Sequence, residues 1–366
     1  MSGFNFRNAL CIAVAVSCLG AVVQTSAASA AEVTFKGKTV RMIVGSPPGG
    51  GTDLGGRLFA RFIGKYLPDS PAIVTQNVPG ASGIKAMNFM AQQAPADGTT
   101  FIAGSSSQIT PDVILKNSVV AYNPTKFEFI GGLASTGTVL VANRAAMERM
   151  AKTGAPIAVA QVGGARTGAQ MPLWGAQYLD WKIKWVSGYQ GTAALTLAML
   201  KGEADMTDTA GIANLKPLIE DGRFDVVVQA GVFSDGKVRR RSALPDVPTM
   251  GELINPKLSG LGKAAFESWQ GTIQIGKFFA LPPGTPKDYV EAYRTAYKKM
   301  GADPEFQAAA VTQLDDDYVL MAPNDVKTII EDMSRTPDEH LKFLLQMREK
   351  YGLPVPEEDK AEKSRD

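Results

Sequence analysis

The sequence is poor in the residues on which most catalytic and metal sites depend. Its 366 residues include 2 cysteines and 1 histidine. Both cysteines, Cys11 and Cys18, lie in the first 31 residues, so disulfides and thiol chemistry are excluded from the rest of the chain. A single histidine, His340, cannot supply the usual zinc or copper ligands. We therefore expect neither a metal nor a cofactor.

The chain also lacks an excess of charge of one sign. Lys and Arg number 38 against 36 Asp and Glu, which gives a formal net charge of +2. Nucleic acids and anionic membranes attract strongly basic proteins, so neither is expected as the main partner.

The apolar run near the start is too short to cross a membrane. Arg7 precedes the uncharged residues 9–23, whereas a membrane helix needs about 20 apolar residues. Ala28-Ser29-Ala30 has the pattern of a signal-peptide cleavage site. We interpret residues 1–31 as a secretory signal peptide that sends the chain to the periplasm; an uncleaved anchor is the alternative.

Short apolar runs alternate with longer helix-compatible stretches through the rest of the chain. The predicted strands are residues 40–44, 100–103, 139–142, 157–162, 184–186 and 226–230. The predicted helices are residues 54–67, 86–93, 171–179, 193–201, 287–300, 304–313 and 324–333. This alternation predicts an α/β architecture with largely parallel sheets, in a chain long enough for two domains.

A glycine-rich loop joins the first predicted strand to the first predicted helix. Residues 45–53 read Gly-Ser-Pro-Pro-Gly-Gly-Gly-Thr-Asp. Glycines let the backbone approach a ligand, and the N-terminus of a helix carries about half a positive charge. Because the spacing fits neither G-x-G-x-x-G nor the P-loop, the loop predicts the binding of an anion such as a carboxylate rather than a nucleotide.

Three more loops rich in small residues follow predicted strands, at residues 104–108, 163–168 and 188–192. One such loop alone is best interpreted as an ordinary turn. Because α/β folds bind ligands where strands end, the four loops together indicate a cleft for a small, acceptor-rich solute. The expected hydroxyl donors are Ser46, Ser105, Ser106, Ser107, Thr167 and Thr192, and the expected backbone donors are Gly49, Gly50, Gly51 and Gly191.

Enzyme motifs are weak. The loop at residues 104–108 lacks the second glycine of a serine nucleophile elbow, and the one histidine falls in a charged C-terminal helix. The acidic run at residues 315–317 lacks the spacing of a calcium-binding EF-hand. We expect a binding protein; the rival interpretation is a periplasmic hydrolase or lyase that uses Asp205 or Asp208 as its base.

Seven short motifs then occur in a distinctive order. They are PPGGGTD at residues 47–53 with Arg57, QNVPGASG at 76–83, APADGT at 94–99 with GSSS at 104–107, GYQG at 188–191, KGEAD at 201–205, LPDVPT at 244–249 with Glu252, and ALPPGTP at 280–286. Together they resemble the periplasmic solute receptors of the tripartite tricarboxylate transporter family, often called Bug receptors.

This resemblance implies a two-lobed, Venus-flytrap fold of the type II periplasmic binding proteins, with hinge strands between the lobes. Residues 32–133 and 268–350 would form lobe 1, residues 134–267 lobe 2, and residues 351–366 a C-terminal tail. A monomer of this kind captures a small organic acid, here a carboxylate or dicarboxylate, and delivers it to a two-component membrane permease. A periplasmic sensory receptor for a carboxylate is the alternative.

The resemblance also assigns ligand contacts by motif. In lobe 1 they are Ser46, Pro48, Gly49, Gly50, Gly51, Thr52, Asp53, Ser105, Ser106 and Ser107, and in lobe 2 they are Tyr189, Gly191, Thr192 and Asp205. Because an acid would repel a bound carboxylate, we interpret Asp53 mainly as a helix cap or as a residue that orients water.

The chain departs from the family pattern at residues 163–170, which contain Arg166 and no histidine. The planar guanidinium of Arg166 suits a second ligand carboxylate; a solvent-facing arginine is the alternative. Nearby aromatic residues would line a site for a ring-bearing acid or belong to the core: Tyr178, Trp181, Trp185 and Tyr189. Residues 255–265 match no part of the pattern, and the arginines at 239–241 are interpreted as a solvated patch.

Overall fold

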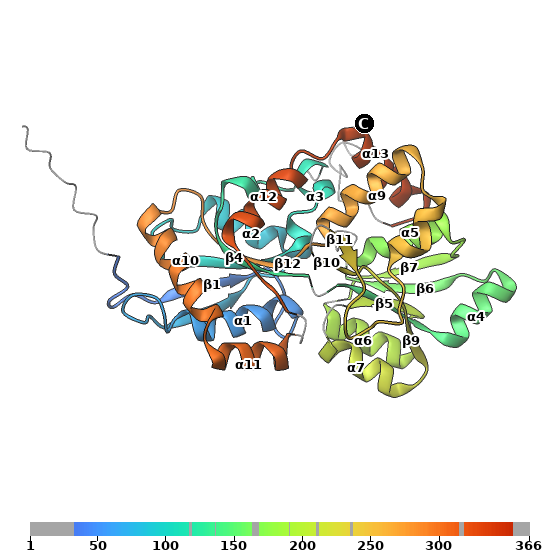
Figure 1. The fold of residues 1–366 in the computed structure, drawn as a ribbon, viewed down its shortest axis with the longest axis horizontal. Helices are drawn as coiled ribbons and strands as arrows, with labels where there is room; N and C mark the ends of the chain where they lie inside the picture. The colour runs from blue at the N-terminus through green and yellow to red at the C-terminus, as the bar shows by residue number, and fades with distance from the viewer. Residues whose placement is uncertain are drawn as a thin grey trace, which may run out of the picture. The chain divides into compact units, whose positions relative to one another are not determined.

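The computed structural model describes residues 33–116, 119–135, 137–162, 168–189, 191–209, 212–234, 237–314 and 318–353. The predicted signal peptide lies outside these residues. Their strands form two mixed sheets and a short β-hairpin, and helices cover both faces of each sheet (Figure 1). The predicted α/β class is therefore confirmed, and each large sheet forms the centre of one lobe.

The first sheet has the strand order β13-β4-β12-β3-β1-β2. Its strands are β1 (Val40–Val44), β2 (Ile73–Asn77), β3 (Thr100–Ser105), β4 (Glu128–Ala134), β12 (Ile275–Leu281) and β13 (Leu320–Met321). Strand β1 pairs in parallel with both β2 and β3. Its residues are almost continuously apolar because both faces of the sheet are covered.

Two groups of helices enclose this sheet. One face carries α1 (Gly51–Ile63), α10 (Lys287–Gly301) and α11 (Pro304–Gln313). The other carries α2 (Ile84–Gln92), α3 (Pro111–Lys116) and α12 (Pro323–Met333). On the first face the ring of Phe59 in α1 stacks on Phe279 of β12, with ring centroids 3.6 Å apart. This contact fixes α1 over the middle of the sheet.

The second sheet has the order β7-β6-β8-β5-β9. Its strands are β5 (Val139–Asn143), β6 (Ile157–Gln161), β7 (Ile183–Ser187), β8 (Met206–Thr209) and β9 (Phe224–Gln229). Helices α6 (Thr192–Lys201) and α7 (Ile212–Asp221) flank one face. The other face carries α4 (Arg144–Thr153), α5 (Met171–Tyr178), α8 (Met250–Ile254), α9 (Gly260–Thr272) and α13 (Asp338–Lys350).

The prediction of largely parallel sheets was wrong. Strand β12 runs antiparallel to both β3 and β4, and β5 runs antiparallel to both β8 and β9. Parallel neighbours need a crossover connection, usually through a helix. Strand β5 enters the second sheet directly from β4 of the first sheet, and β12 enters the first sheet after α9 of the second lobe. Neither strand therefore belongs to a strand–helix–strand crossover within one sheet. The strands that pass between the lobes are therefore the ones that break the parallel pattern.

The packing of α9 and α13 departs from the predicted division between residues 134–267 and 268–350. Trp269 of α9 and Leu344 and Met347 of α13 lie in one buried cluster with Trp174 of α5. The side chains of α13 thus complete the core of the second lobe. The remaining domain boundaries stay predictions.

Two segments without a predicted role also have a place in this lobe. Residues 255–265 form the short 3-10 helix η5 (Asn255–Lys257) and the first part of α9. Arg241 is not part of a solvated patch, since it is 1% exposed and its Nη1 donates to the Gly137 carbonyl at 3.4 Å. Arg240 forms an ion pair with Glu252 at 2.9 Å.

Candidate functional site

The loops after β1, β2 and β3 leave the first sheet at a common edge. The three strands are parallel neighbours, so their carboxyl ends lie side by side. The glycine-rich loop at residues 45–50, the segment at residues 78–83 and the serine-rich residues 105–107 follow these ends. The structure therefore brings together all the predicted first-lobe contacts at one edge of the sheet.

The glycine-rich loop leads into a helix start whose backbone N–H groups are not covered by side chains. Gly50 is the N-cap of α1 and has no side chain to cap the helix. In the part of the chain that the structure describes, the first-turn N–H groups of Gly51, Thr52 and Asp53 have no hydrogen-bond acceptor within the protein, as helix geometry predicts. The Ser46 Oγ is buried there without a partner. These groups provide unfilled donors suited to a carboxylate.

Asp53 organises this loop. Its Oδ2 accepts from the Gly49 N–H at 2.9 Å, its Oδ1 accepts from Asn77 Nδ2 at 2.9 Å, and both oxygens lie 3.0 Å from Arg57 Nε. Burial by itself raises the pKa of Asp53, but the hydrogen bonds from Arg57, Asn77 and Gly49 outweigh it, and the pKa is lowered. The carboxylate is 2% exposed. Its geometry fits an organising residue better than the ligand contact assigned by motif.

Two side-chain amides connect the loops at this edge. Asn77, the last residue of β2, also donates to the Ser46 carbonyl at 2.8 Å. Gln108 donates to the Ser82 carbonyl at 2.6 Å and to Ser105 Oγ at 3.0 Å, and it accepts from the Ser105 N–H at 2.6 Å. Ser105 is thus engaged in a capping box with Gln108.

The second lobe repeats part of this arrangement at the carboxyl ends of β6 and β7. Helix α6 begins at Thr192 behind a glycine N-cap, Gly191, whose φ of 113° favours glycine. Gln161 ends β6, is fully buried, and donates to Ser187 Oγ at 2.9 Å. Arg166 and Thr167 lie outside the described residues, so their roles stay predictions.

Asp205 was misplaced by its motif. It precedes β8, at the end opposite to the strand ends that carry Gln161 and Ser187. Its Oδ2 accepts from the Ala158 N–H at 2.9 Å and lies 3.3 Å from Arg149 Nη2. Asp205 therefore fixes the amino end of β8. Asp208 lies near the other end and is 3% exposed.

The predicted aromatic wall is mostly core. Tyr178, Trp181 and Trp185 pack against the buried cluster around Trp174, and Trp185 Nε1 donates to the Tyr351 carbonyl at 2.8 Å. Tyr189 packs against the opposite cluster, and its hydroxyl lies 3.4 Å from Glu203 Oε2. Burial, together with Glu203, raises the pKa of Tyr189. These contacts favour the structural alternative for all four rings.

A serine–histidine pair does occur in the structure, but its position does not suit nucleophilic catalysis. His340 Nδ1 lies 2.8 Å from Ser268 Oγ, which joins α13 to α9. Ser268 lies inside a helix rather than on a strand-to-helix turn, and Glu339 Oε1 is 4.0 Å from His340 Nε2, too far for a hydrogen bond. Among the described residues there is also no cluster of three metal-ligating side chains.

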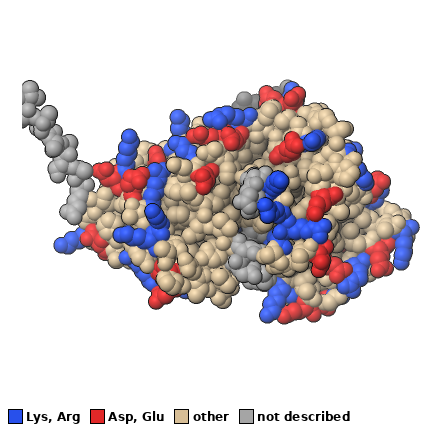
Figure 2. Space-filling view, in the orientation of Figure 1, with Lys and Arg blue, Asp and Glu red and all other residues tan. Residues whose placement is uncertain are grey.

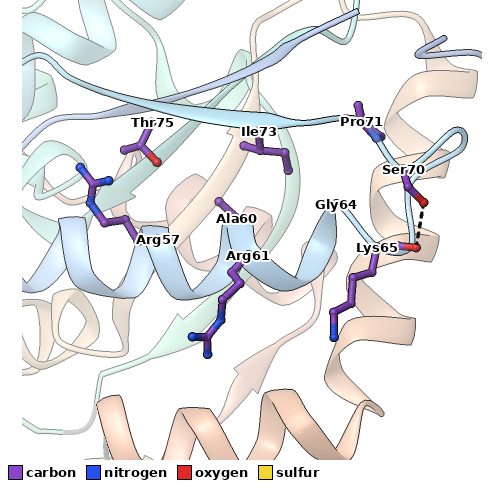
Figure 3. Close-up of a pocket in the computed structure, with 9 residues that line it drawn as sticks. All are labelled: Arg57, Ala60, Arg61, Gly64, Lys65, Ser70, Pro71, Ile73 and Thr75. Carbon is purple, nitrogen blue, oxygen red and sulfur yellow. Dashed lines mark hydrogen bonds between the residues drawn. The ribbon is translucent and has the colours of Figure 1, made fainter. Parts of the chain in front are cut away.

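Two surface hollows lie away from the start of α1. One is a groove of about 460 Å³ between α1 and the edge strand β2; Figure 3 shows the residues that line it. Its cations include Arg57 and Lys65, which bond to Asp53 and Glu305. A second hollow of about 490 Å³ lies near α8 and α9. On the face drawn in Figure 2, positive and negative side chains are interspersed. Neither hollow is lined by the first-turn groups of α1.

Several organising residues were not predicted as site residues: Arg57, Asn77, Gln108 and Gln161. Asn77 and Gln161 end strands, and Arg57 stands four residues after Asp53 in the first turn of α1; side chains at such positions are well placed to bond a loop. Gln108 stands three residues after Ser105, which is the spacing of a capping box. No described helix has both the length and the apolar character to cross a membrane.

No protein-family model matches the chain. A segment of 74 residues is 39% identical to Protein BugT of Bordetella pertussis; it covers 20% of this chain and 22% of BugT. The matched part is thus about a fifth of the relative.

Solved structures resemble the chain over most of its length. The periplasmic binding protein BugD matches with a TM-score of 0.64 at 20% identity, over 86% of this chain and 98% of BugD. MatC from Rhodopseudomonas palustris with bound malate matches with a TM-score of 0.64 at 22% identity, over 82% and 98% of the two chains. The R. palustris protein Rpa4515 with adipate matches with a TM-score of 0.65 at 19% identity, over 86% and 97%.

The fold is thus that of the two-lobed periplasmic binding proteins. Within that class, the chain has the fold of the Bug-type solute-binding proteins, and with the BugT segment this confirms the resemblance drawn from its motifs.

Proposed function

We propose that this chain is a periplasmic solute-binding receptor that captures a small dicarboxylate and delivers it to a two-component membrane permease. The observation that carries the proposal is the glycine-capped start of α1, where three first-turn N–H groups adjoin the buried, unpartnered Ser46 hydroxyl. Backbone donors at a helix N-terminus favour an anion without any chemistry on it. The receptor leaves its ligand unchanged.

The dicarboxylate class rests on two similar structures, which hold malate and adipate. In this proposal one carboxylate docks on the first lobe at residues 46–52, and the second lobe closes over the ligand with Gly191, Thr192 and the predicted contacts Arg166 and Thr167. Closure is favoured only by contacts that exist in the closed form. The receptor acts in the periplasm as a monomer, after removal of residues 1–31.

A thermal-shift panel tests the proposal. The protein is heated with malate, adipate, citrate, benzoate or acetate, and each acid is afterwards recovered and analysed. At a hundredfold excess over Kd a bound acid raises Tm by about 5 °C, and we expect this for a dicarboxylate that is recovered intact. A Tm unchanged by every acid, or an acid converted into product, would contradict the proposal.

A further inference from the structure

We propose that the exposed hydroxyl of Ser187, positioned by the buried amide of Gln161, donates to the second carboxylate of the ligand and makes the receptor select dicarboxylates over monocarboxylates. This inference rests on the proposed function and adds two residues to which the motifs assign no ligand contact. It begins from an unusual burial, because Gln161 is polar and 0% exposed at the end of β6, which is otherwise apolar.

The register of the second sheet places the two side chains next to each other. Strands β6 and β7 are parallel neighbours (Figure 1), and Gln161 pairs directly with Ser187. Val159 and Trp185, which stand two residues earlier in each strand, both pack in the cluster around Trp174. Since side chains alternate between the faces of a sheet, Gln161 and Ser187 share the face on which that cluster lies.

The pair also lies at the ligand-binding end of its strands. Ser187 directly precedes the predicted ligand loop at residues 188–192, and Gln161 stands two residues before the predicted loop at residues 163–168. Parallel strands of α/β folds bind ligands beyond their carboxyl ends. The Gln161–Ser187 pair is therefore placed where both predicted loops of the second lobe begin.

The hydrogen bond between the two residues fixes the role of the serine. Gln161 Nε2 donates to Ser187 Oγ at 2.9 Å, and in the described part of the chain this is the one side-chain hydrogen bond of Ser187. A hydroxyl has one proton to donate and two lone pairs. Because the amide occupies a lone pair, the O–H of Ser187 points away from Gln161, and Ser187 is exposed. The serine thus presents a donor at the surface.

A donor held in this way suits a carboxylate. A hydrogen bond to an ionised acceptor is about twice as strong as one between neutral groups. The methyl end of a monocarboxylic acid offers no acceptor, so such an acid gains nothing from Ser187. The acid of β8 at this level, Asp208, is separated from Ser187 by strand β6, which puts the two strands about 10 Å apart. Ser187 therefore adds affinity for a ligand with a second carboxylate.

The test compares Ser187→Ala, Ser187→Thr, Gln161→Leu and the double variant Gln161→Leu/Ser187→Ala with the unsubstituted protein. Ser259→Ala is the matched control, because Ser259 is an exposed serine of the second lobe that precedes α9 without capping it through its side chain. Calorimetry measures the binding of two pairs of acids, adipate with hexanoate and malate with β-hydroxybutyrate. Each pair differs by one carboxylate. Melting in the absence of ligand reports on folding.

We expect Ser187→Ala to weaken binding of the dicarboxylate about tenfold and to leave binding of the matched monocarboxylate unchanged. Ser187→Thr keeps the hydroxyl and should keep the selectivity, and Ser259→Ala should behave like the unsubstituted protein. Gln161→Leu should weaken dicarboxylate binding about threefold when Ser187 is present and have no further effect in the double variant. A purely structural role of Gln161 would instead weaken binding of every acid in both backgrounds.

Two results would overturn this inference alone. One is a Ser187→Ala variant that binds dicarboxylates as tightly as the unsubstituted protein, or that loses affinity equally for both acids of a pair. The other is an unsubstituted protein that binds both acids of each pair with the same affinity. If the unsubstituted protein bound neither malate nor adipate, the proposed function would fall as well.

Discussion

The two lobes fix their strand-end loops with different partners. In the first lobe, Asn77 and Gln108 donate to backbone carbonyls of neighbouring loops, and Asp53 accepts from three donors. In the second lobe, Gln161 donates to the hydroxyl of Ser187, and its own Oε1 is buried without a partner in the part of the chain that the structure describes.

This difference indicates that the loops of the first lobe are held more rigidly than those of the second. Bonds to backbone carbonyls fix the shape of a loop, because a carbonyl cannot rotate away, whereas a hydroxyl can turn to another partner. Under the proposed function, the first lobe therefore presents a preformed anion site, and the second lobe keeps polar groups that can be rearranged when it closes on a ligand. Such a preformed site lowers the entropic cost of binding.

The largest expected effect comes from filling the glycine-rich loop. A Cβ on Gly50 would lie 3.2 Å from the Pro47 carbonyl and 3.3 Å from Ser46 Oγ, although the backbone angles there suit any residue. We expect Gly50→Val to fold, to lose the ligand-induced rise in Tm, and to bind dicarboxylates more than about a hundredfold more weakly.

The control for this variant is Gly271→Val in α9, where a Cβ contacts nothing within 4 Å. It should keep the ligand-induced rise. If both variants kept that rise, the first lobe would not contain the anion site.

The second expected effect is on stability. Asp53→Ala removes the acceptor of the Gly49, Arg57 and Asn77 donors and should cost about 3 kcal/mol of unfolding free energy, measured in urea. The same substitution should make the first-lobe loop as adaptable as the second, so that binding weakens too. A loss below about 0.5 kcal/mol would contradict the role of Asp53 as organiser.

The same residue predicts a pH effect of known sign. The pKa of Asp53 is lower in the folded protein than its ordinary value, which is about 3.9 in unfolded chains. Its contribution to stability is therefore complete above pH ~4 and is lost as the pH falls through the lower folded value. Acid titrations in urea should show a steep loss below pH ~4 in the unsubstituted protein and a shallower one in Asp53→Ala.

The smallest expected effects come from the side-chain amides of Asn77 in the first lobe and Gln161 in the second. Asn77→Leu removes the side-chain donor to the Ser46 carbonyl and one of the three donors to Asp53, and it should cost about 2 kcal/mol. Gln161→Leu removes one bond to a hydroxyl and one acceptor that is already unfilled, so it should cost less than about 1 kcal/mol. Urea unfolding of both variants measures the difference. Equal costs would mean that the lobes are organised alike.

Local elements were predictable where the sequence carries a local signal. Strand β1 and helix α11 begin and end where they were predicted. In α11 the signal is Asp303-Pro304, which supplies the N-cap and the first residue of the helix. Helix α1 begins three residues earlier than predicted and ends at Ile63, since a glycine N-cap gives no side-chain signal. Strand β12 was not predicted, because its pairing joins residues far apart in the chain.

The grouping of loops at the candidate site was also predictable from local sequence, but the contacts between those loops were not. The glycine-rich and serine-rich loops lie at one edge because a strand precedes each, and this order is visible in the sequence. Asp205 was misplaced because its motif does not say at which end of β8 it lies. The charge of Asp53 predicted a structural role, and its hydrogen bonds fit that interpretation. Its partner Asn77 lies 24 residues away, and only the parallel pairing of β1 with β2 brings the two together.

The most direct measurement is the amide spectrum of the protein labelled with ¹⁵N at glycine and threonine, titrated with the dicarboxylate that gives the largest rise in Tm. Binding should shift the N–H signals of Gly50, Gly51 and Thr52 strongly, while those of Gly202 and Gly352, at the ends of helices away from the strand-end loops, stay in place. Unchanged signals from the start of α1 at saturating ligand would contradict the claim that these amides hold the carboxylate.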